Sequence, residues 1–130
     1  MIANNASSTY LNSKVMTASP QELTLMLYDA ALKFCNQAIR AVENNKIEEA
    51  HNAIIKTENI ILEFMSTLDE KYDVAKNMEL MYDYIYRRLL EANLKKDKVI
   101  LEEIQGYIRE LRDTWKEAME LVKMKRVVNE

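Results

Sequence analysis

The chain has 130 residues, and its 48% hydrophobic content suits one domain with a single core. One Gly and one Pro leave few residues for the tight turns of β-rich folds, and a single Gly also excludes glycine-rich nucleotide-binding loops. With 18 Lys and Arg against 21 Asp and Glu, the net charge is -3, which argues against a nucleic-acid-binding surface.

Cysteine content and hydropathy indicate the compartment. The single cysteine, Cys35, cannot form an intramolecular disulfide, which fits a reducing environment. The first ten residues lack the basic and apolar regions of a signal peptide, and no uncharged apolar run approaches the ~18 residues of a membrane span. We therefore expect a cytoplasmic protein without membrane insertion.

The N-terminal part divides at Ser19. Residues 1–18 are rich in Asn, Ala, Ser and Thr and show no sustained helical periodicity, so we expect a flexible arm. A capping box, Ser19-Pro20-Gln21-Glu22, then predicts a helix that ends near Asn44-Asn45. Its expected core stripe is Leu23, Leu27, Ala30, Phe34, Ala38 and Ala41.

Three further helices follow from the same three-to-four spacing. The second helix is expected to begin at the N-cap Asn45 and to end around 68–69. The third helix has Asp73 as its expected N-cap. The fourth helix opens at Asp97 and contains Gly106. The expected core residues are Ile47, Ala50, Ile54, Thr57, Ile61, Phe64 and Leu68, then Val74, Met78, Met81, Ile85, Leu89 and Ala92, then Ile100, Ile104, Leu111, Trp115, Ala118 and Val122.

Sequential amphipathic helices with short connections pack antiparallel around a shared core. The predicted fold is therefore all-α, an antiparallel up-down four-helix bundle over residues 19–130 with an N-terminal capping arm over residues 1–18.

Apolar side chains outside the expected stripes form second ridges on three helices. They are Leu25, Tyr28, Leu32 and Ile39, then Ile55, Ile60 and Leu62, then Leu80, Tyr84, Tyr86, Leu90 and Leu94. A wider core, a homodimer face, or grooves that receive a partner segment would each account for them. We expect the arm, through Tyr10, Leu11 and Val15, to lie over such a surface as a removable lid; a disordered arm is the alternative.

Catalysis is not expected. Glu48 and His51 have the Glu-x-x-His spacing of di-iron helix bundles, but His51 is the only histidine, so the second motif that such a site requires is missing. No nucleophile can be paired with a base from the sequence. We expect no catalytic residue, no cofactor and no bound metal.

Several segments together resemble the flagellar secretion chaperones, the flagellin-specific export chaperones of the flagellar type III secretion system. They are Thr17-Ala18-Ser19-Pro20-Gln21-Glu22-Leu23 with Leu25-Met26-Leu27-Tyr28-Asp29, Tyr82-Asp83-Tyr84-Ile85-Tyr86-Arg87-Arg88-Leu89 with Glu91-Ala92-Asn93, and Leu111-Arg112-Asp113-Thr114-Trp115. One departure is Ala30, where relatives often have Gly.

The resemblance implies a cytosolic bundle that binds the disordered C-terminal segment of flagellin, prevents premature polymerisation and delivers the subunit to the export apparatus. It also implies a binding role for Tyr10 in the arm and, less directly, for Leu11 and Val15. From the ridges we add the candidate partner-binding residues Leu25, Tyr28, Leu32, Ile55, Leu62, Tyr86 and Leu90. A flagellar regulatory protein as a further partner, a homodimer of the unliganded chain, and a regulatory adaptor that binds a folded partner remain open alternatives.

Overall fold

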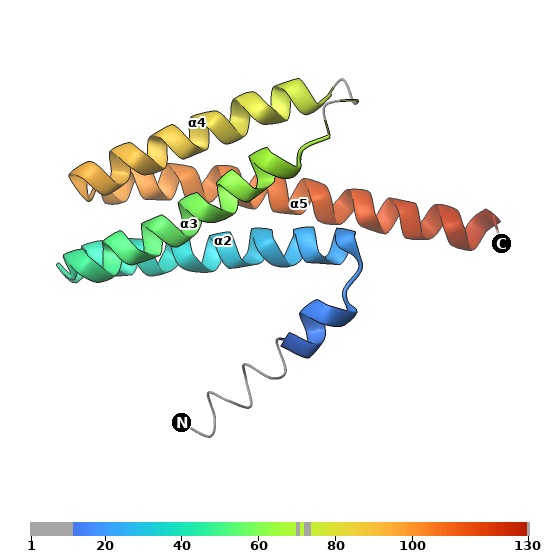
Figure 1. Ribbon diagram of the computed structural model, residues 1–130, viewed down its shortest axis with the longest axis horizontal. Coiled ribbons are helices and arrows are strands. Elements are labelled where there is room, and N and C mark those ends of the chain that lie inside the picture. Colours follow the sequence, from blue (N-terminus) through green and yellow to red (C-terminus); the bar gives the residue numbers. More distant parts are fainter. Residues whose placement is uncertain (1–11, 70, 72–73, 130) are drawn as a thin grey trace.

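The computed structural model describes residues 12–69, 71 and 74–129, and four long helices dominate it. They are α2 (Pro20–Glu43), α3 (Ile47–Thr67), α4 (Val74–Lys95) and α5 (Lys98–Asn129) (Figure 1). Both α2 and α4 pack against α3 and against α5, so each helix lies beside its neighbours in the chain and α5 returns to α2. The predicted antiparallel up-down bundle is confirmed.

The helix boundaries follow local capping chemistry. Ser19 Oγ accepts a hydrogen bond from the Glu22 backbone N–H at 3.2 Å, which is the predicted start of α2. At the start of α5, Asp97 Oδ1 accepts from the Val99 N–H at 2.8 Å, as also predicted. The expected cap Asp73 lies outside the described residues.

The connection between α2 and α3 corrects one prediction. Asn45 has φ 57°, and its N–H donates to Val42 O at 3.1 Å, while the Lys46 N–H donates to Ala41 O at 2.8 Å. This is the Schellman arrangement that terminates a helix. The expected N-cap role of Asn45 is wrong, because Asn45 closes α2 in the left-handed conformation and the N-cap of α3 is Lys46, which makes no side-chain capping bond.

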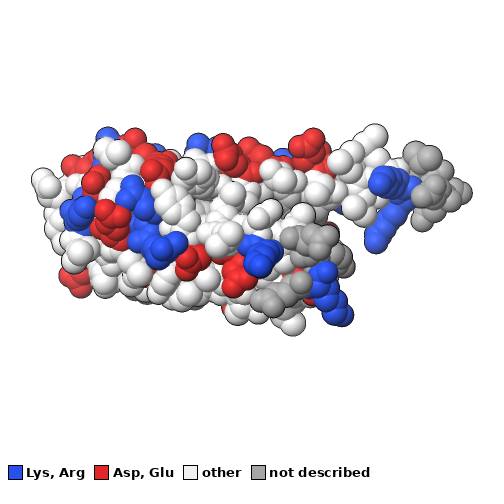
Figure 2. Space-filling model, turned by 90° about the horizontal axis from the view of Figure 1, so that it is seen from above, with Lys and Arg blue, Asp and Glu red and all other residues white. Residues whose placement is uncertain are grey.

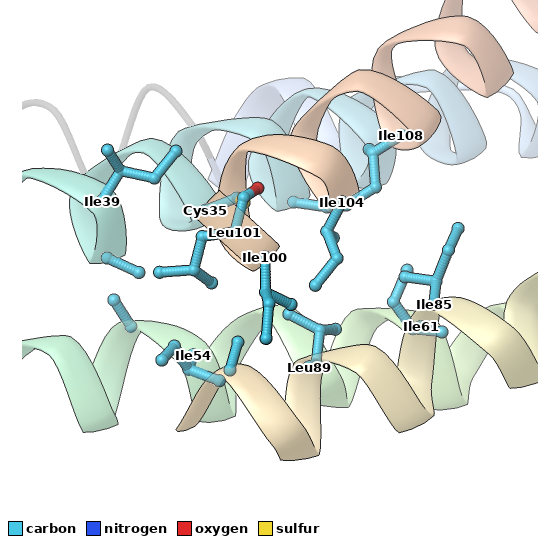
Figure 3. Close-up of a cluster of buried hydrophobic side chains, with 14 of the residues drawn as sticks. Cys35, Ile39, Ile54, Ile61, Ile85, Leu89, Ile100, Leu101, Ile104 and Ile108 are labelled. Carbon is cyan, nitrogen blue, oxygen red and sulfur yellow. The ribbon is translucent and has the colours of Figure 1, made fainter. Parts of the chain in front are cut away.

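The core is a set of branched aliphatic side chains contributed by all four helices (Figure 3). Small residues on α2 allow the other helices to approach it closely. One of these small residues, Cys35, is fully buried and donates its S–H to Leu101 O at 3.4 Å. Burial raises the pKa of the Cys35 thiol to about 12, so the thiol is inert. The fully buried aliphatic members are Ile54, Ile61, Ile85, Leu89, Leu101, Ile104 and Ile108.

The buried face of α2 differs from the expected one by about one residue. Tyr28, Ala31, Cys35 and Ile39 are buried, whereas Phe34 and three further expected core residues, Leu23, Leu27 and Ala30, are only half-buried. The cause is that α2 packs against α3 on one side and α5 on the other, and these two contacts together set its buried face. Ala38 and Ala41 of the expected stripe are buried as predicted.

Smaller corrections apply to α3, α4 and α5. At the start of α3, Ile47 is exposed, whereas the rest of its expected stripe is buried or half-buried. On α4, Ala75 and Tyr82 are buried in place of the expected Val74 and Met81, which are exposed. On α5, Ala118 and Val122 are exposed because the helix continues past the ends of its neighbours (Figure 1).

The arm leaves the bundle at the start of α2. Residues 12–17, expected to be irregular, form a short helical segment that points away from the four long helices (Figure 1). Within the described parts of the chain, no helix combines the length and hydropathy that crossing a membrane requires.

Candidate partner-binding site

Four of the predicted ridge residues lie along the line where α3 meets α4. The His51 imidazole and the Asn93 side-chain amide are within hydrogen-bond distance across this line, with Nδ1 and Nδ2 2.9 Å apart. On α3, Ile55 and Leu62 follow His51 by four and eleven residues and therefore share its face.

On α4, Tyr86 and Leu90 precede Asn93 by seven and three residues and face the same line. We call the surface formed by Ile55, Leu62, Tyr86 and Leu90 the α3–α4 face.

The α3–α4 face exposes apolar side chains to solvent. The exposed fractions are 36% for Ile55, 41% for Leu62 and 46% for Leu90, while Tyr86 is half-buried and packs against the core. Figure 2 shows the molecule from above, the side on which α4 lies: charged side chains of both signs are densest at one end, acidic ones also line one long edge, and uncharged residues cover much of the middle. Such a surface can receive the apolar side of a partner helix.

The ridge residues of α2 lie elsewhere. Asp29 on α2 pairs with Arg112 Nη1 on α5 at 3.3 Å. Leu25 and Leu32 lie one helical turn before and after Asp29, so they belong to the line between α2 and α5, where both are half-buried. Because α2 and α5 form the side of the bundle opposite the α3–α4 face, the predicted residues do not make one continuous surface.

The position of Tyr28 is a further correction. It is 2% exposed, its hydroxyl lies 2.7 Å from that of Tyr82, and its ring contacts Phe64 with centroids 4.4 Å apart. Burial raises the pKa of both tyrosines. Tyr28 and Ile39 belong to the core although they lie outside the expected stripe, so for these two residues the wider-core explanation of the ridge holds.

Two hollows flank the point where the arm joins the bundle. The first, about 330 Å³, is bordered by Tyr28, Phe64 and Tyr82 together with α4 residues that include Met78. The second, about 340 Å³, lies between the start of α2 and α5 and is lined by Ser19, Gln21, Glu22, Trp115, Ala118, Met119, Val122, Lys123 and Arg126. Trp115 lines both hollows, and its indole N–H donates to Gln21 O at 3.1 Å.

The arm itself is described only in part. Val15 is 43% exposed and Met16 is 86% exposed, so neither is covered in this conformation. Tyr10 and Leu11 lie outside the described residues. The lid therefore stays a prediction.

Polar contacts cross two other sides of the bundle. Glu103 on α5 accepts hydrogen bonds from Arg88 Nε at 3.0 Å and from the Tyr84 hydroxyl at 3.1 Å, both on α4. Lys98 at the start of α5 lies 3.3 Å from Glu43 on α2. These contacts fix α5 against both neighbours, although each exposed pair contributes little to stability by itself.

Sequence reasoning missed Glu58. Its side chain is on α3, only 5% exposed, and its Oε1 atom finds no hydrogen-bond partner among the described residues. Burial raises the pKa of the Glu58 carboxyl, and the nearby His51 opposes this shift. The sequence spacing already indicated that Glu58 is buried, because Glu58 is four residues after Ile54 and three before Ile61, beside the expected core stripe.

No metal site appears in the described residues, where no cluster of three His, Cys, Asp or Glu side chains is suited to bind an ion. His51, half of the Glu-x-x-His pair, is exposed and contacts Asn93 instead.

Comparison with known proteins identifies the family. The sequence profile described as "Flagellar protein FliS" matches residues 3–122 of this chain. The chain belongs to the FliS family. The resemblance to flagellar secretion chaperones is thereby confirmed, and this family membership implies a chaperone rather than an enzyme.

Two relatives show the extent of the similarity. The flagellar secretion chaperone FliS of Bacillus subtilis is 43% identical over 120 residues, covering 92% of this chain and 90% of that protein. The flagellar secretion chaperone FliS of Escherichia coli is 35% identical over 112 residues, covering 84% and 82%. The FliS match thus spans nearly the whole bundle.

A solved structure supports the fold. A bacterial protein whose crystal structure is titled as that of a flagellar chaperone superposes with a TM-score of 0.73 at 18% identity, covering 91% of this chain and 98% of that one.

Proposed function

We propose that this chain is a cytoplasmic, non-enzymatic chaperone that binds the C-terminal segment of flagellin through its α3–α4 face. Binding prevents premature polymerisation, and the complex is then delivered to the flagellar export apparatus. Membership of the FliS family together with the exposed apolar side chains of the α3–α4 face supports this proposal.

The apolar chemistry of the α3–α4 face suits reversible binding of a partner. Each large apolar side chain that a bound helix buries contributes about 1.5–3 kcal/mol, and the ordering of a disordered segment opposes this gain. No covalent or metal bond is needed. The resulting moderate affinity allows the client to be released at the export apparatus.

Calorimetric titration with the C-terminal segment of flagellin from the same organism tests this function. We expect one segment per chain and a gain of helical circular dichroism on binding, because the segment folds as it binds. Absence of binding at high micromolar concentration would contradict the proposal. The homodimer and the regulatory adaptor would then be the remaining uses of the same face.

The arm is proposed to act as a removable lid through Tyr10, Leu11 and Val15. Deletion of residues 1–16 should then change the affinity for the flagellin segment and increase binding of a hydrophobic fluorescent dye, since it uncovers apolar surface. The single variant Tyr10→Ala should reproduce part of the effect. An unchanged affinity and dye signal would contradict the lid.

A further inference from the structure

Glu58 lies at the border between the core and the α3–α4 face. Around the helix, it is within about 60° of the buried pair Ile54 and Ile61 on one side and of the exposed pair Ile55 and Leu62 on the other. Glu58 therefore lies at the edge of the apolar surface that a partner would cover, with its side chain 5% exposed and its Oε1 atom buried.

The register of α3 against α4 shows which residue of α4 lies opposite Glu58. His51 contacts Asn93 across the two helices, and Phe64 stacks on Tyr82 with centroids 5.5 Å apart. Glu58 lies two turns after His51, just as Tyr86 lies two turns before Asn93. Glu58 is thus midway along the length of the α3–α4 face, opposite Tyr86 in the antiparallel register.

A carboxylate in this position is costly to the free protein. Its Oε1 atom has no hydrogen-bond partner among the described residues, and the side chain is 5% exposed. Removing an acidic group from water without a partner destabilises the folded state, whereas a cation at hydrogen-bond distance offsets that cost. A neutral donor compensates less, because a cation adds the Coulombic attraction of an opposite charge to the hydrogen bond.

We propose that Glu58 selects the segment bound on the α3–α4 face by accepting a hydrogen bond from a Lys or Arg side chain of that segment. The matching occupant is an amphipathic helix with two apolar residues about two turns, or ~10.5 Å, apart that contact Ile55 and Leu62, and with the cation between them. This inference rests on the proposed function and specifies its client chemically.

The burial that raises the pKa of Glu58 supports the inference, since a bound cation would stabilise the ionised form. The aliphatic stem of Lys or Arg adds a second reason, because it can cross the apolar surface while its charged end reaches the carboxylate.

A double-mutant cycle tests the pair. The flagellin C-terminal segment is titrated into the full chain and into Glu58→Gln, first unchanged and then with each of its Lys and Arg residues replaced singly by Met. We expect Glu58→Gln to weaken binding at least about tenfold. One of the Met substitutions should cause a similar loss in the wild-type chain and almost none in Glu58→Gln.

Glu63→Gln is the matched control. Glu63 is an exposed acid on the same helix, so its variant loses the same charge without touching the buried site. We expect its affinity to stay within about twofold of wild type. An equal loss in Glu63→Gln would overturn the proposal by showing a general charge effect.

Other outcomes are equally decisive. If the wild-type chain binds the segment but Glu58→Gln binds it equally well, the role of Glu58 is wrong while the chaperone function stands. If the wild-type chain does not bind it, the proposed function fails, and this inference with it. Should Glu58→Gln not fold, Glu58→Met, which removes the acceptor and keeps the volume, should show the same loss, and wild-type affinity would overturn the proposal.

Discussion

At the scale of single residues, the hydroxyl pair of Tyr28 and Tyr82 shows how a polar contact is accommodated in an apolar core. The two oxygens lie 2.7 Å apart, and both side chains are at most 3% exposed. Each hydroxyl therefore depends on the other, and the loss of one leaves an unpaired buried group.

Tyr28→Phe should lower the free energy of unfolding by about 1–3 kcal/mol, because the Tyr82 hydroxyl loses its partner. The double variant Tyr28→Phe with Tyr82→Phe should cost less than the two single variants summed, since neither hydroxyl then remains unpaired. Urea unfolding followed by circular dichroism measures all four proteins. Additive costs would show that the two hydroxyls do not depend on each other.

Glu58 predicts a dependence of stability on pH. Burial raises the pKa of the folded carboxyl above its unfolded value, so the folded state holds the proton more tightly. This contribution to stability is complete below the usual carboxyl pKa and is lost as pH rises through the raised one. The unliganded wild-type chain should therefore lose stability relative to Glu58→Gln as the pH rises above the usual carboxyl pKa and through the raised one.

Urea unfolding of the two proteins at several pH values measures this difference, since the other titrating groups are shared. Glu63→Gln should run parallel to the wild type, because that side chain is exposed. A difference between wild type and Glu58→Gln that does not change with pH would mean that the folded carboxyl titrates normally.

At the scale of elements, the sequence predicted where helices begin and end better than which face each one buries. Capping side chains act locally, so Ser19 and Asp97 were recognised from their neighbours in the chain. The buried face of α2 depends on where α3 and α5 pack, which no local pattern specifies. Tyr28 was therefore misplaced. Glu58 on α3 was overlooked for a different reason, since its spacing from Ile54 and Ile61 already placed it beside the expected core stripe.

The turn after α2 illustrates a second limit. Asn is favoured both at the N-cap of a helix and in the left-handed residue that ends one, so the Asn44-Asn45 pair fits either role. The positive φ of Asn45 decides for the second.

The one glycine of the chain offers a test of α5. Gly106 lies within the helix, and a Cβ placed there would meet nothing within 4 Å. Gly106→Ala should raise the free energy of unfolding by about 0.5–1 kcal/mol, because Ala loses less backbone entropy in a helix. Thermal or urea unfolding measures the change. A destabilised variant would show that α5 packs against a neighbour at this point.

At the scale of the whole molecule, the sides of the bundle differ in their chemistry. Ion pairs and hydrogen bonds join α5 to α2 and to α4, whereas the α3–α4 face carries exposed aliphatic residues beside a buried carboxylate. The sequence predicted the fold and family and supplied the four residues of this face. Their separation from Leu25 and Leu32 became apparent only from the packing of the helices.

The central claim is that the α3–α4 face binds the flagellin segment, and the affinity of a double variant tests it most directly. Ile55→Ser with Leu62→Ser removes two aliphatic side chains from this face, and Leu80→Ser with Val99→Ser removes two that are exposed elsewhere, at 65% and 73%.

Calorimetric titration of both proteins with the segment should show at least about a thirtyfold loss for the first pair, since each buried aliphatic side chain contributes about 1.5–3 kcal/mol, and less than about threefold for the second. Equal affinities for the two double variants would contradict the account.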